Sequence, residues 1–273
     1  FVPPIQEWTY KTKRGVVAVF GGAPGTTGAA ALCAAGCARS RAGLVHLFVE
    51  EEAYPILASK LSSVLVHPWR GGAGSLDGYT AVAVGPGWGR TKDRLATLRD
   101  LSNLDIPGVV DADGLNVMAD AAAEGEPISF RVPWVLTPHP GECARLTGAT
   151  TGEILSDPVP VCRRLAADSN AVVVMKSHVT YVVPPEGRVR IVDGMNAALG
   201  TGGSGDVLCG VIGALLAAGA PPAEAAAAGV LVHAEAGRRC RKADGWFLTD
   251  DLPIVVGRIF GEPKFMNGVG GRR

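Results

Sequence analysis

Short apolar runs alternate with amphipathic or alanine-rich segments along most of the chain. Runs such as 16–20 and 171–175 have no polar interruption, which predicts strands buried on both faces. Similar runs predict strands at 45–49, 80–84, 108–110 and 134–136. Helices are predicted at 29–41, 54–62, 91–101, 206–218, 223–241 and about 248–260.

Strands that alternate with helices predict an α/β fold with a mostly parallel sheet and helices on both faces. Segments 180–183 and 189–192 flank Pro-Pro-Glu-Gly and predict a hairpin at one side of the sheet. No break in composition divides the chain. We therefore expect an N-terminal tail at 1–14, one domain at 15–262 and a disordered tail at 263–273.

The composition excludes several classes of partner. The 273 residues include 26 basic and 26 acidic side chains, which predicts neither a nucleic-acid surface nor a basic membrane patch. The longest apolar run, 207–222, is too short and glycine-broken to span a bilayer. Six cysteines lack metal-ligand spacing, and residues 1–4 lack a signal-peptide pattern, so we expect a cytoplasmic location and no metal held by protein ligands alone.

Glycine- or proline-rich loops follow several predicted strands. They are Gly21–Gly28, Gly85–Gly89, Thr137–Glu142 and Asn196–Asp206. Ligands of open α/β sheets bind beyond the carboxyl ends of the strands, so we expect these loops to converge on one cleft.

The loop Asn196–Asp206 carries the strongest candidate chemistry. Gly202, Gly203 and Gly205 bracket Ser204 and place Asp206 in the first turn of an apolar helix. Such a helix start suits a phosphate, and the aspartate can take a proton from a hydroxyl that attacks that phosphate. A glycine turn with Asp206 as a simple helix-start residue is the alternative.

Three other segments present polar side chains at strand ends. In Thr137-Pro-His-Pro-Gly-Glu142, two prolines fix the direction of His139, either as a ligand contact or as a hydrogen-bonded turn residue. Lys176 follows a strand and can reach a phosphate, with Thr180 nearby, or can be an ordinary exposed lysine. Asp111 and Asp113 suit a metal, although Asp113 can equally cap the next helix. A Ser-His-Asp site and a Walker loop have no support in the spacing.

In this order, the segments resemble the ADP/ATP-dependent NAD(P)H-hydrate dehydratases of the ribokinase-like superfamily over about residues 12–262. The matching segments are Gly21-Gly-x-x-Gly, Gly28-Ala-Ala, Gly85-Pro-Gly-x-Gly89, Asp111-Ala-Asp-Gly-Leu-Asn116, Thr137-Pro-His-Pro-Gly-Glu142, Lys176-x-x-x-Thr180 and Asn196-x-x-Leu-x-x-Gly-Gly-Ser-Gly-Asp206. The resemblance implies a three-layer ribokinase-like sandwich. It also implies a repair lyase that uses ADP or ATP, with Mg²⁺, to dehydrate hydrated NADH or NADPH.

The resemblance also implies roles for particular residues. Asp206 would be the base that deprotonates the ring hydroxyl, and the amides of Gly203 and Gly205 would stabilise the phosphoryl group under attack. The nucleotide would contact Lys176, Ser177, His178, Val179, Thr180, Asn196, Ala197, Ala198, Leu199, Gly202, Gly203, Ser204 and Gly205. The hydrated cofactor would contact Ala29, Gly87, His139, Pro140, Gly141, Glu142 and Asp206. Ser177 and Gly200 depart from the family pattern, which often has glycine and alanine there.

Two other functions remain open at this stage. A vitamin-precursor or sugar kinase of the same fold would share the glycine–aspartate loop, whereas a non-catalytic dinucleotide-binding protein would need no base. The Thr137–Glu142 segment favours the dehydratase over the kinase. We also expect a homo-oligomer, with a tetramer among the options, and an epimerase as a fused or separate partner.

Overall fold

The computed structural model describes residues 8–194 and 196–262, and within them nine strands form one sheet. The order is β3-β2-β1-β4-β5-β6-β7-β8-β9. The strands are β1 (Val16–Phe20), β2 (Leu44–Glu50), β3 (Leu65–Trp69), β4 (Ala81–Val84), β5 (Gly108–Val110), β6 (Trp134–Leu136), β7 (Ala171–Met175), β8 (Val179–Val183) and β9 (Arg190–Asp193). Strands β3 to β7 are parallel, and the predicted hairpin adds β8 and β9 antiparallel at one edge.

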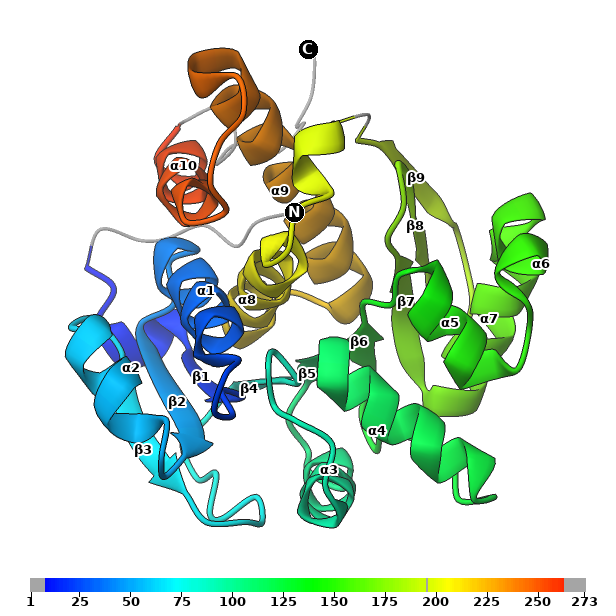
Figure 1. Ribbon diagram of the computed structural model, residues 1–273, viewed down its shortest axis with the longest axis horizontal. Helices are drawn as coiled ribbons and strands as arrows, with labels where there is room; N and C mark the ends of the chain where they lie inside the picture. The colour runs from blue at the N-terminus through cyan, green and yellow to red at the C-terminus, as the bar shows by residue number, and fades with distance from the viewer. Residues whose placement is uncertain (1–7, 195, 263–273) are drawn as a thin grey trace.

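Helices cover both faces of this sheet, as Figure 1 shows. They are α1 (Thr27–Arg39), α2 (Tyr54–Lys60), α3 (Lys92–Ser102), α4 (Ala112–Ala123), α5 (Pro140–Thr147), α6 (Thr151–Ser156), α7 (Pro158–Ser169), α8 (Ser204–Ala217), α9 (Pro222–Asp244) and α10 (Asp251–Phe260), with short 3₁₀ helices η1 (Lys11–Arg14) and η2 (Ala197–Leu199). Helices α1, α8, α9 and α10 pack on one side, and α3 to α7 on the other. The predicted α/β sandwich is confirmed.

Alternate residues of the central strands pack into two separate hydrophobic cores, one on each face of the sheet. In β1, Val17 and Val19 join the core under α1 and α8, whereas Ala18 and Phe20 join the core under α3 and α4. All four side chains are at most 1% exposed. A strand buried on both faces has no polar position to alternate, which explains the uninterrupted apolar runs in the sequence.

Strand β3 is absent from the prediction. Its sequence contains Pro68, and its residues are exposed or half-buried. It pairs with β2 alone, so it is an edge strand, where a proline can be tolerated because one side of the backbone needs no partner.

Residues 1–7 of the predicted N-terminal tail lie outside the described residues, and the rest of it includes a short helix. Lys11–Arg14 forms η1, and the carbonyl of Gly15 accepts hydrogen bonds from the amides of Gly43 and Leu44. The predicted C-terminal tail, 263–273, lies outside the described residues. Among the residues that are described, no helix is long and apolar enough to cross a membrane.

Backbone hydrogen bonds join the predicted loops in pairs at the carboxyl edge of the sheet. The amide of Ala23 donates to the carbonyl of Gly87 at 2.6 Å, which ties the first glycine loop to the loop after β4. The amide of Lys176 donates to the carbonyl of Pro138 at 2.8 Å, which ties the end of β7 to the loop after β6. Backbone contacts therefore join neighbouring strand ends at this edge, β1 to β4 and β6 to β7.

Candidate active site

Helix α8 begins without a cap from its own sequence. Its N-cap residue is Gly203, which has φ +93° and offers no side-chain hydrogen bond. A Cβ at Gly203 would also lie 2.5 Å from Leu32 Cδ1, which could move aside, so it is the left-handed backbone that favours glycine here. The amide of Ser204 donates to the carbonyl of Thr201 at 3.3 Å, and the next two amides, of Gly205 and Asp206, are left for a ligand in the arrangement that suits a phosphate.

Asp206 lies in the first turn of this helix. Among the described residues, no hydrogen bond or ion pair engages its carboxylate. Burial, reinforced by the neighbouring carboxylates of Asp111, Asp113 and Glu142, raises the pKa of Asp206 to about 7, although Lys176 opposes the shift. A carboxylate with this pKa can act as a general base near neutral pH.

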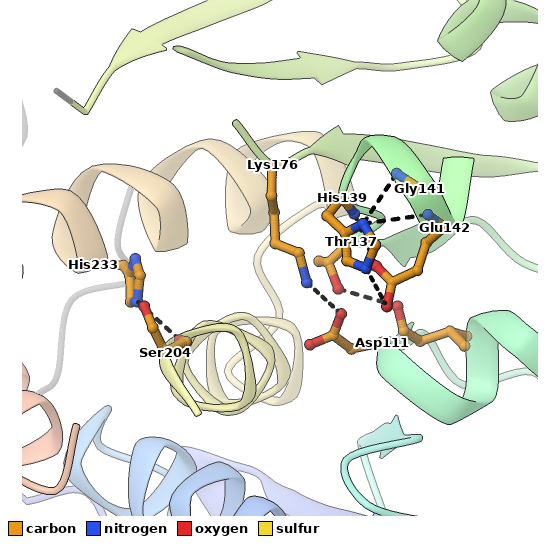
Figure 2. A network of polar contacts seen from close by, with 9 residues as sticks. Asp111, Thr137, His139, Gly141, Glu142, Lys176, Ser204 and His233 are labelled. Atoms are coloured by element: carbon orange, nitrogen blue, oxygen red, sulfur yellow. Dashed lines mark hydrogen bonds and ion pairs between the residues drawn. The ribbon is translucent and has the colours of Figure 1, made fainter. Parts of the chain in front are cut away.

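Lys176 and Asp111 form a buried ion pair beside this turn. The Lys176 Nζ lies 2.6 Å from Asp111 Oδ1, and the Asp111 side chain is only 2% exposed (Figure 2). Burial by itself would lower the pKa of Lys176, but Asp111 and Glu142 hold it above its ordinary value. The lysine is therefore charged at the carboxyl end of the sheet, as expected, with a protein carboxylate as its partner.

The ion pair occupies the space that a side chain at Gly205 would need. A Cβ there would lie 3.1 Å from Lys176 Nζ and 3.4 Å from Asp111 Oδ2. Gly205 thus lets the charged pair approach the start of α8, which places a cation and an anion next to the predicted phosphate site.

Gly205→Ala is expected to lower turnover by about tenfold while the protein stays folded, because the added methyl displaces Lys176 by a few tenths of an ångström. Steady-state kinetics with hydrated NADPH and ADP, the substrates that the sequence resemblance implies, measure the loss. Gly152→Ala is the matched control, since Gly152 is also the second residue of a helix and its nearest non-neighbour atom would lie 3.9 Å away. Equal turnover in the two variants would contradict the proposed crowding.

His139 and Glu142 form a capping box at the start of α5. The amides of Gly141 and Glu142 donate to His139 Nδ1 at 3.0 and 3.3 Å, and the amide of His139 donates to a Glu142 carboxylate oxygen at 2.8 Å. His139 is therefore a hydrogen-bonded turn residue, which was one of the two predicted roles. Its side chain remains 51% exposed and lines a cavity, so a ligand contact stays open to it.

Asp113 does not cap α4. The N-cap position belongs to Asp111, and Asp113 lies in the first turn of the helix, where its Oδ2 accepts a hydrogen bond from the amide of Gly89 at 2.8 Å. On the other side of the same loop, Thr26 Oγ1 donates to the carbonyl of Gly87 at 2.9 Å. The loop Gly85–Gly89 is therefore held between α4 and the chain just before Ala29.

A cavity of about 780 Å³ opens between the end of β7, the β8–β9 hairpin and the start of α8. Most of the predicted nucleotide-binding residues line it: Lys176, Ser177, His178, Thr180, Asn196, Ala197, Leu199, Gly202, Ser204 and Gly205. Val179, Ala198 and Gly203 are not part of its wall. The cavity therefore gathers side chains from two loops that are about 20 residues apart in sequence.

Of the predicted cofactor-binding residues, only His139 lines this cavity. Gly87 and Ala29 belong to the neighbouring loops joined by Thr26, and Pro140, Gly141 and Glu142 form the first turn of α5. Asp206 lies between the two groups, because Gly205 next to it lines the cavity and Asp113, which influences its pKa, holds the Gly85–Gly89 loop. The predicted residues thus fall into two groups that adjoin at Asp206.

Asn196 carries an unused donor at the cavity wall. Its Oδ1 accepts a hydrogen bond from the amide of Ala198 at 3.2 Å, which fixes the orientation of the side-chain amide. Its Nδ2 is buried and finds no acceptor in the described part of the chain. A ligand with a hydrogen-bond acceptor would satisfy this nitrogen.

Asp206→Asn is expected to be more stable than the wild type at pH 8, by about 4 kcal/mol. The folded-state pKa of Asp206 is raised from 3.8 to about 7, so its ionisation above pH 7 destabilises the fold. The penalty disappears as pH falls from 7 toward 3.8, and the advantage of the variant should disappear with it. Urea unfolding of both proteins between pH 4 and 8 measures the difference; a difference independent of pH would contradict the assignment.

His233 was not among the residues predicted from the sequence, and burial keeps its side chain neutral. Its pKa is lowered to about 4, chiefly by burial, so its contribution to stability is present above pH 6.5 and lost as pH falls toward 4. This dependence is opposite to that of Asp206.

His233 Nε2 lies 3.0 Å from Ser204 Oγ, which joins α9 to the start of α8 (Figure 2). A lone histidine in an alanine-rich helix gives no pattern from which this contact could be predicted.

Comparison with known proteins first defines the fold class. A ribokinase-like protein from Enterococcus faecalis superposes with a TM-score of 0.85 at 22% identity, over 97% of this chain and 92% of the other. The ADP/ATP-dependent NAD(P)H-hydrate dehydratase from Bacillus subtilis, co-crystallised with ATP and Mg²⁺, superposes with a TM-score of 0.83 at 24% identity, over 97% and 95%. The chain has a ribokinase-like fold.

Sequence relatives then define the family. The sequence model of the NAD(P)H-hydrate dehydratase family matches residues 17–254. The ADP-dependent (S)-NAD(P)H-hydrate dehydratase of Neisseria meningitidis is 33% identical over 94% of this chain and 84% of its own length. The bifunctional NAD(P)H-hydrate repair enzyme Nnr of Mycobacterium leprae is 38% identical over 94% of this chain. The chain belongs to the NAD(P)H-hydrate dehydratase family, and it spans about half the length of the bifunctional relatives.

Proposed function

We propose that this chain is a lyase that repairs hydrated NADH or NADPH with ADP or ATP as the phosphoryl donor. The observation that carries the proposal is Asp206. Its carboxylate has no partner among the described residues, has a pKa of about 7, and lies in the first turn of an uncapped helix beside a large cavity. A protein that only binds a dinucleotide has no need of such a base.

The proposed reaction has two stages. Asp206 accepts the proton of the ring hydroxyl, and the hydroxyl oxygen forms a bond to the terminal phosphorus of the nucleotide while the bond to the leaving nucleotide breaks. The amides at Gly203 and Gly205 stabilise the negative charge of that phosphoryl group. The ring nitrogen then supplies the electron pair that expels phosphate, and loss of a ring proton restores the dihydronicotinamide.

The arrangement of residues supports this division of labour. The cavity beside Lys176 and the start of α8 has the size of a ligand site, with the unused amide of Asn196 in its wall. The Gly85–Gly89 loop and the first turn of α5 lie on the other side of Asp206 and would hold the hydrated cofactor. Asp206 would then face the ring hydroxyl and the phosphoryl group together.

Mg²⁺ would accompany the nucleotide. Within residues 8–194 and 196–262, no three histidine, cysteine or acidic side chains are placed to hold a metal by themselves. Mg²⁺ commonly binds through one or two carboxylates and the phosphates of its substrate, and Asp111 and Asp113 near the start of α8 fit that requirement. The ion would neutralise phosphate charge, and no step above is assigned to it.

Incubation with hydrated NADPH and either ADP or ATP tests the proposal. Return of dihydronicotinamide absorbance, with release of phosphate, supports it. As controls, the protein should not phosphorylate ribose, hydroxymethylpyrimidine or hydroxyethylthiazole. Phosphorylation of one of these without activity on the hydrated cofactor would instead favour a small-molecule kinase.

The proposal extends to the setting of the enzyme. Relatives that are named bifunctional repair enzymes are about twice as long as this chain, so we propose that an epimerase acts with this domain, either fused to it or separate. A homo-oligomer and a cytoplasmic location stay predictions, which sedimentation and cell fractionation would test.

A further inference from the structure

The start of α8 requires support from outside its own helix. Gly203 has no side chain to cap the helix, and its left-handed backbone favours glycine, the residue that loses most conformational freedom on folding. The proposed function requires the amides of this turn to face a phosphate, so their own capping groups are not available. Two buried polar side chains from the C-terminal part of the chain contact this turn instead.

His233 of α9 supplies one contact. Its Nε2 lies 2.9 Å from the carbonyl oxygen of Ser204 and 3.0 Å from Ser204 Oγ. A carbonyl oxygen can only accept, so Nε2 carries the proton and donates a hydrogen bond to Ser204. His233 is 9% exposed and Ser204 is 4% exposed, so water replaces little of this interaction.

Thr249, between α9 and α10, supplies the other contact. Its Oγ1 donates to the carbonyl of Gly202 at 2.9 Å, and its methyl group would be 3.2 Å from a Cβ at Gly203. Thr249 is 7% exposed. The carbonyls of Gly202 and Ser204 flank Gly203, so the two contacts hold the loop on both sides of its left-handed residue.

We propose that His233 and Thr249 are positioning residues that hold the Gly202–Gly205 loop in the shape that binds the terminal phosphate of the nucleotide. Both donate to oxygen atoms of the loop, so they fix its backbone and leave its amides free for the ligand. Burial keeps His233 uncharged at neutral pH, so its contribution comes from geometry and not from an added positive charge. The identity of the ligand as ADP or ATP rests on the proposed function; the support of the loop does not.

Calorimetric titration with ADP and with adenosine tests this role. His233→Leu keeps a similar volume without the donor, and we expect about a tenfold weaker affinity for ADP, the effect of one lost hydrogen bond. His233→Gln retains an N–H donor and should recover part of the affinity. Adenosine has no phosphate, so its affinity should stay within about twofold of the wild type.

The Thr249 pair gives an independent measurement that does not depend on the histidine variant folding. Thr249→Val preserves the shape and removes the donor, whereas Thr249→Ser preserves the donor, so only the first should weaken ADP binding. Leu231→Ala on α9 is the control, because Leu231 is 51% exposed and lies outside the cavity wall. Circular dichroism confirms that each variant is folded.

The outcomes separate this inference from the proposed function. Selective loss of ADP affinity in Thr249→Val, with rescue in Thr249→Ser, supports the inference even if the protein fails to dehydrate hydrated NADPH. Unchanged ADP affinity in folded His233→Leu and Thr249→Val overturns it. An equal loss for adenosine and ADP also overturns it, because His233, which lines the cavity, and Thr249 behind the loop would then shape the site as a whole and not the phosphate position.

Discussion

Replacing Asp206 by asparagine is expected to lower turnover of hydrated NADPH by about 10²–10⁴, the usual effect of losing a general base. Asparagine preserves the shape of the side chain and cannot accept the proton of the ring hydroxyl. The carboxylate has no partner among the described residues, so its replacement should leave the start of α8 intact. Steady-state kinetics measure the loss, and calorimetry should show ADP affinity close to that of the wild type.

The pH dependence of the wild type adds a second measurement. A base must be ionised to act, and the pKa of Asp206 is about 7, so kcat/KM should fall as pH decreases through 7. The residual activity of Asp206→Asn should lack this dependence. Asp120→Asn is the matched control, since Asp120 is 53% exposed and pairs with Arg90 away from the cavity. More than about a tenth of wild-type turnover in Asp206→Asn would contradict its role.

The sequence predicts the fold well where burial is uniform. Strands β1 and β7 begin and end where the apolar runs 16–20 and 171–175 do, because both faces of these strands are covered. Strand β3 was missed because an edge strand has weaker burial and tolerates Pro68. The hairpin was predicted from its Pro-Pro-Glu-Gly turn, a local signal that does not depend on packing.

In the candidate site, too, features that depend on neighbouring residues were predicted, and features that depend on distant residues were not. The glycine loop and Asp206 were predicted because a loop, a helix start and an acid lie within a few residues of one another. The partner of Asp113 is Gly89, 24 residues away, so the expected helix cap was wrong for a reason that no local pattern contains. The His139–Glu142 capping box is local and could have been predicted from the glutamate three residues after the cap.

Lys176 shows how a residue can be located without its interactions being known. Its position at a strand end is local, whereas its partner Asp111 is 65 residues away. Lys176 follows β7 and Asp111 follows β5. The two side chains meet because β5, β6 and β7 are parallel and their carboxyl ends lie at one edge of the sheet. The ion pair does not exclude a phosphate contact, because a lysine ammonium has three donors and the side chain is 22% exposed to the cavity.

A second buried cation, Arg94, lies at the same edge of the sheet below the Gly85–Gly89 loop. Its guanidinium forms an ion pair with Glu50, and its Nε donates to the carbonyl of Trp88 at 2.8 Å. The group also lies 4.2 Å from the centre of the Trp69 ring. The side chain is 3% exposed, so Arg94 connects the ends of β2 and β3 to the loop that carries Gly87.

Arg94→Met is expected to lower the free energy of unfolding by about 3–5 kcal/mol, because it leaves the carboxylate of Glu50 and the carbonyl of Trp88 without their partner. Arg94→Lys should recover only part of this, since an ammonium cannot donate to both groups in the planar geometry of the guanidinium. Urea unfolding measures the changes. Affinity for hydrated NADPH should fall as well if the Gly85–Gly89 loop holds that ligand, because the loop loses its support from α3.

Arg99→Met is the matched control, with the same substitution in the same helix. Arg99 is 43% exposed and pairs with Glu126, which is 61% exposed, so this exposed pair should contribute at most about 1 kcal/mol. A difference of less than about 1 kcal/mol between the two variants would show that burial adds nothing to the Arg94 interactions. The two variants can be compared directly because both arginines belong to α3 and each pairs with a glutamate. They differ in burial, since only Arg94 is buried.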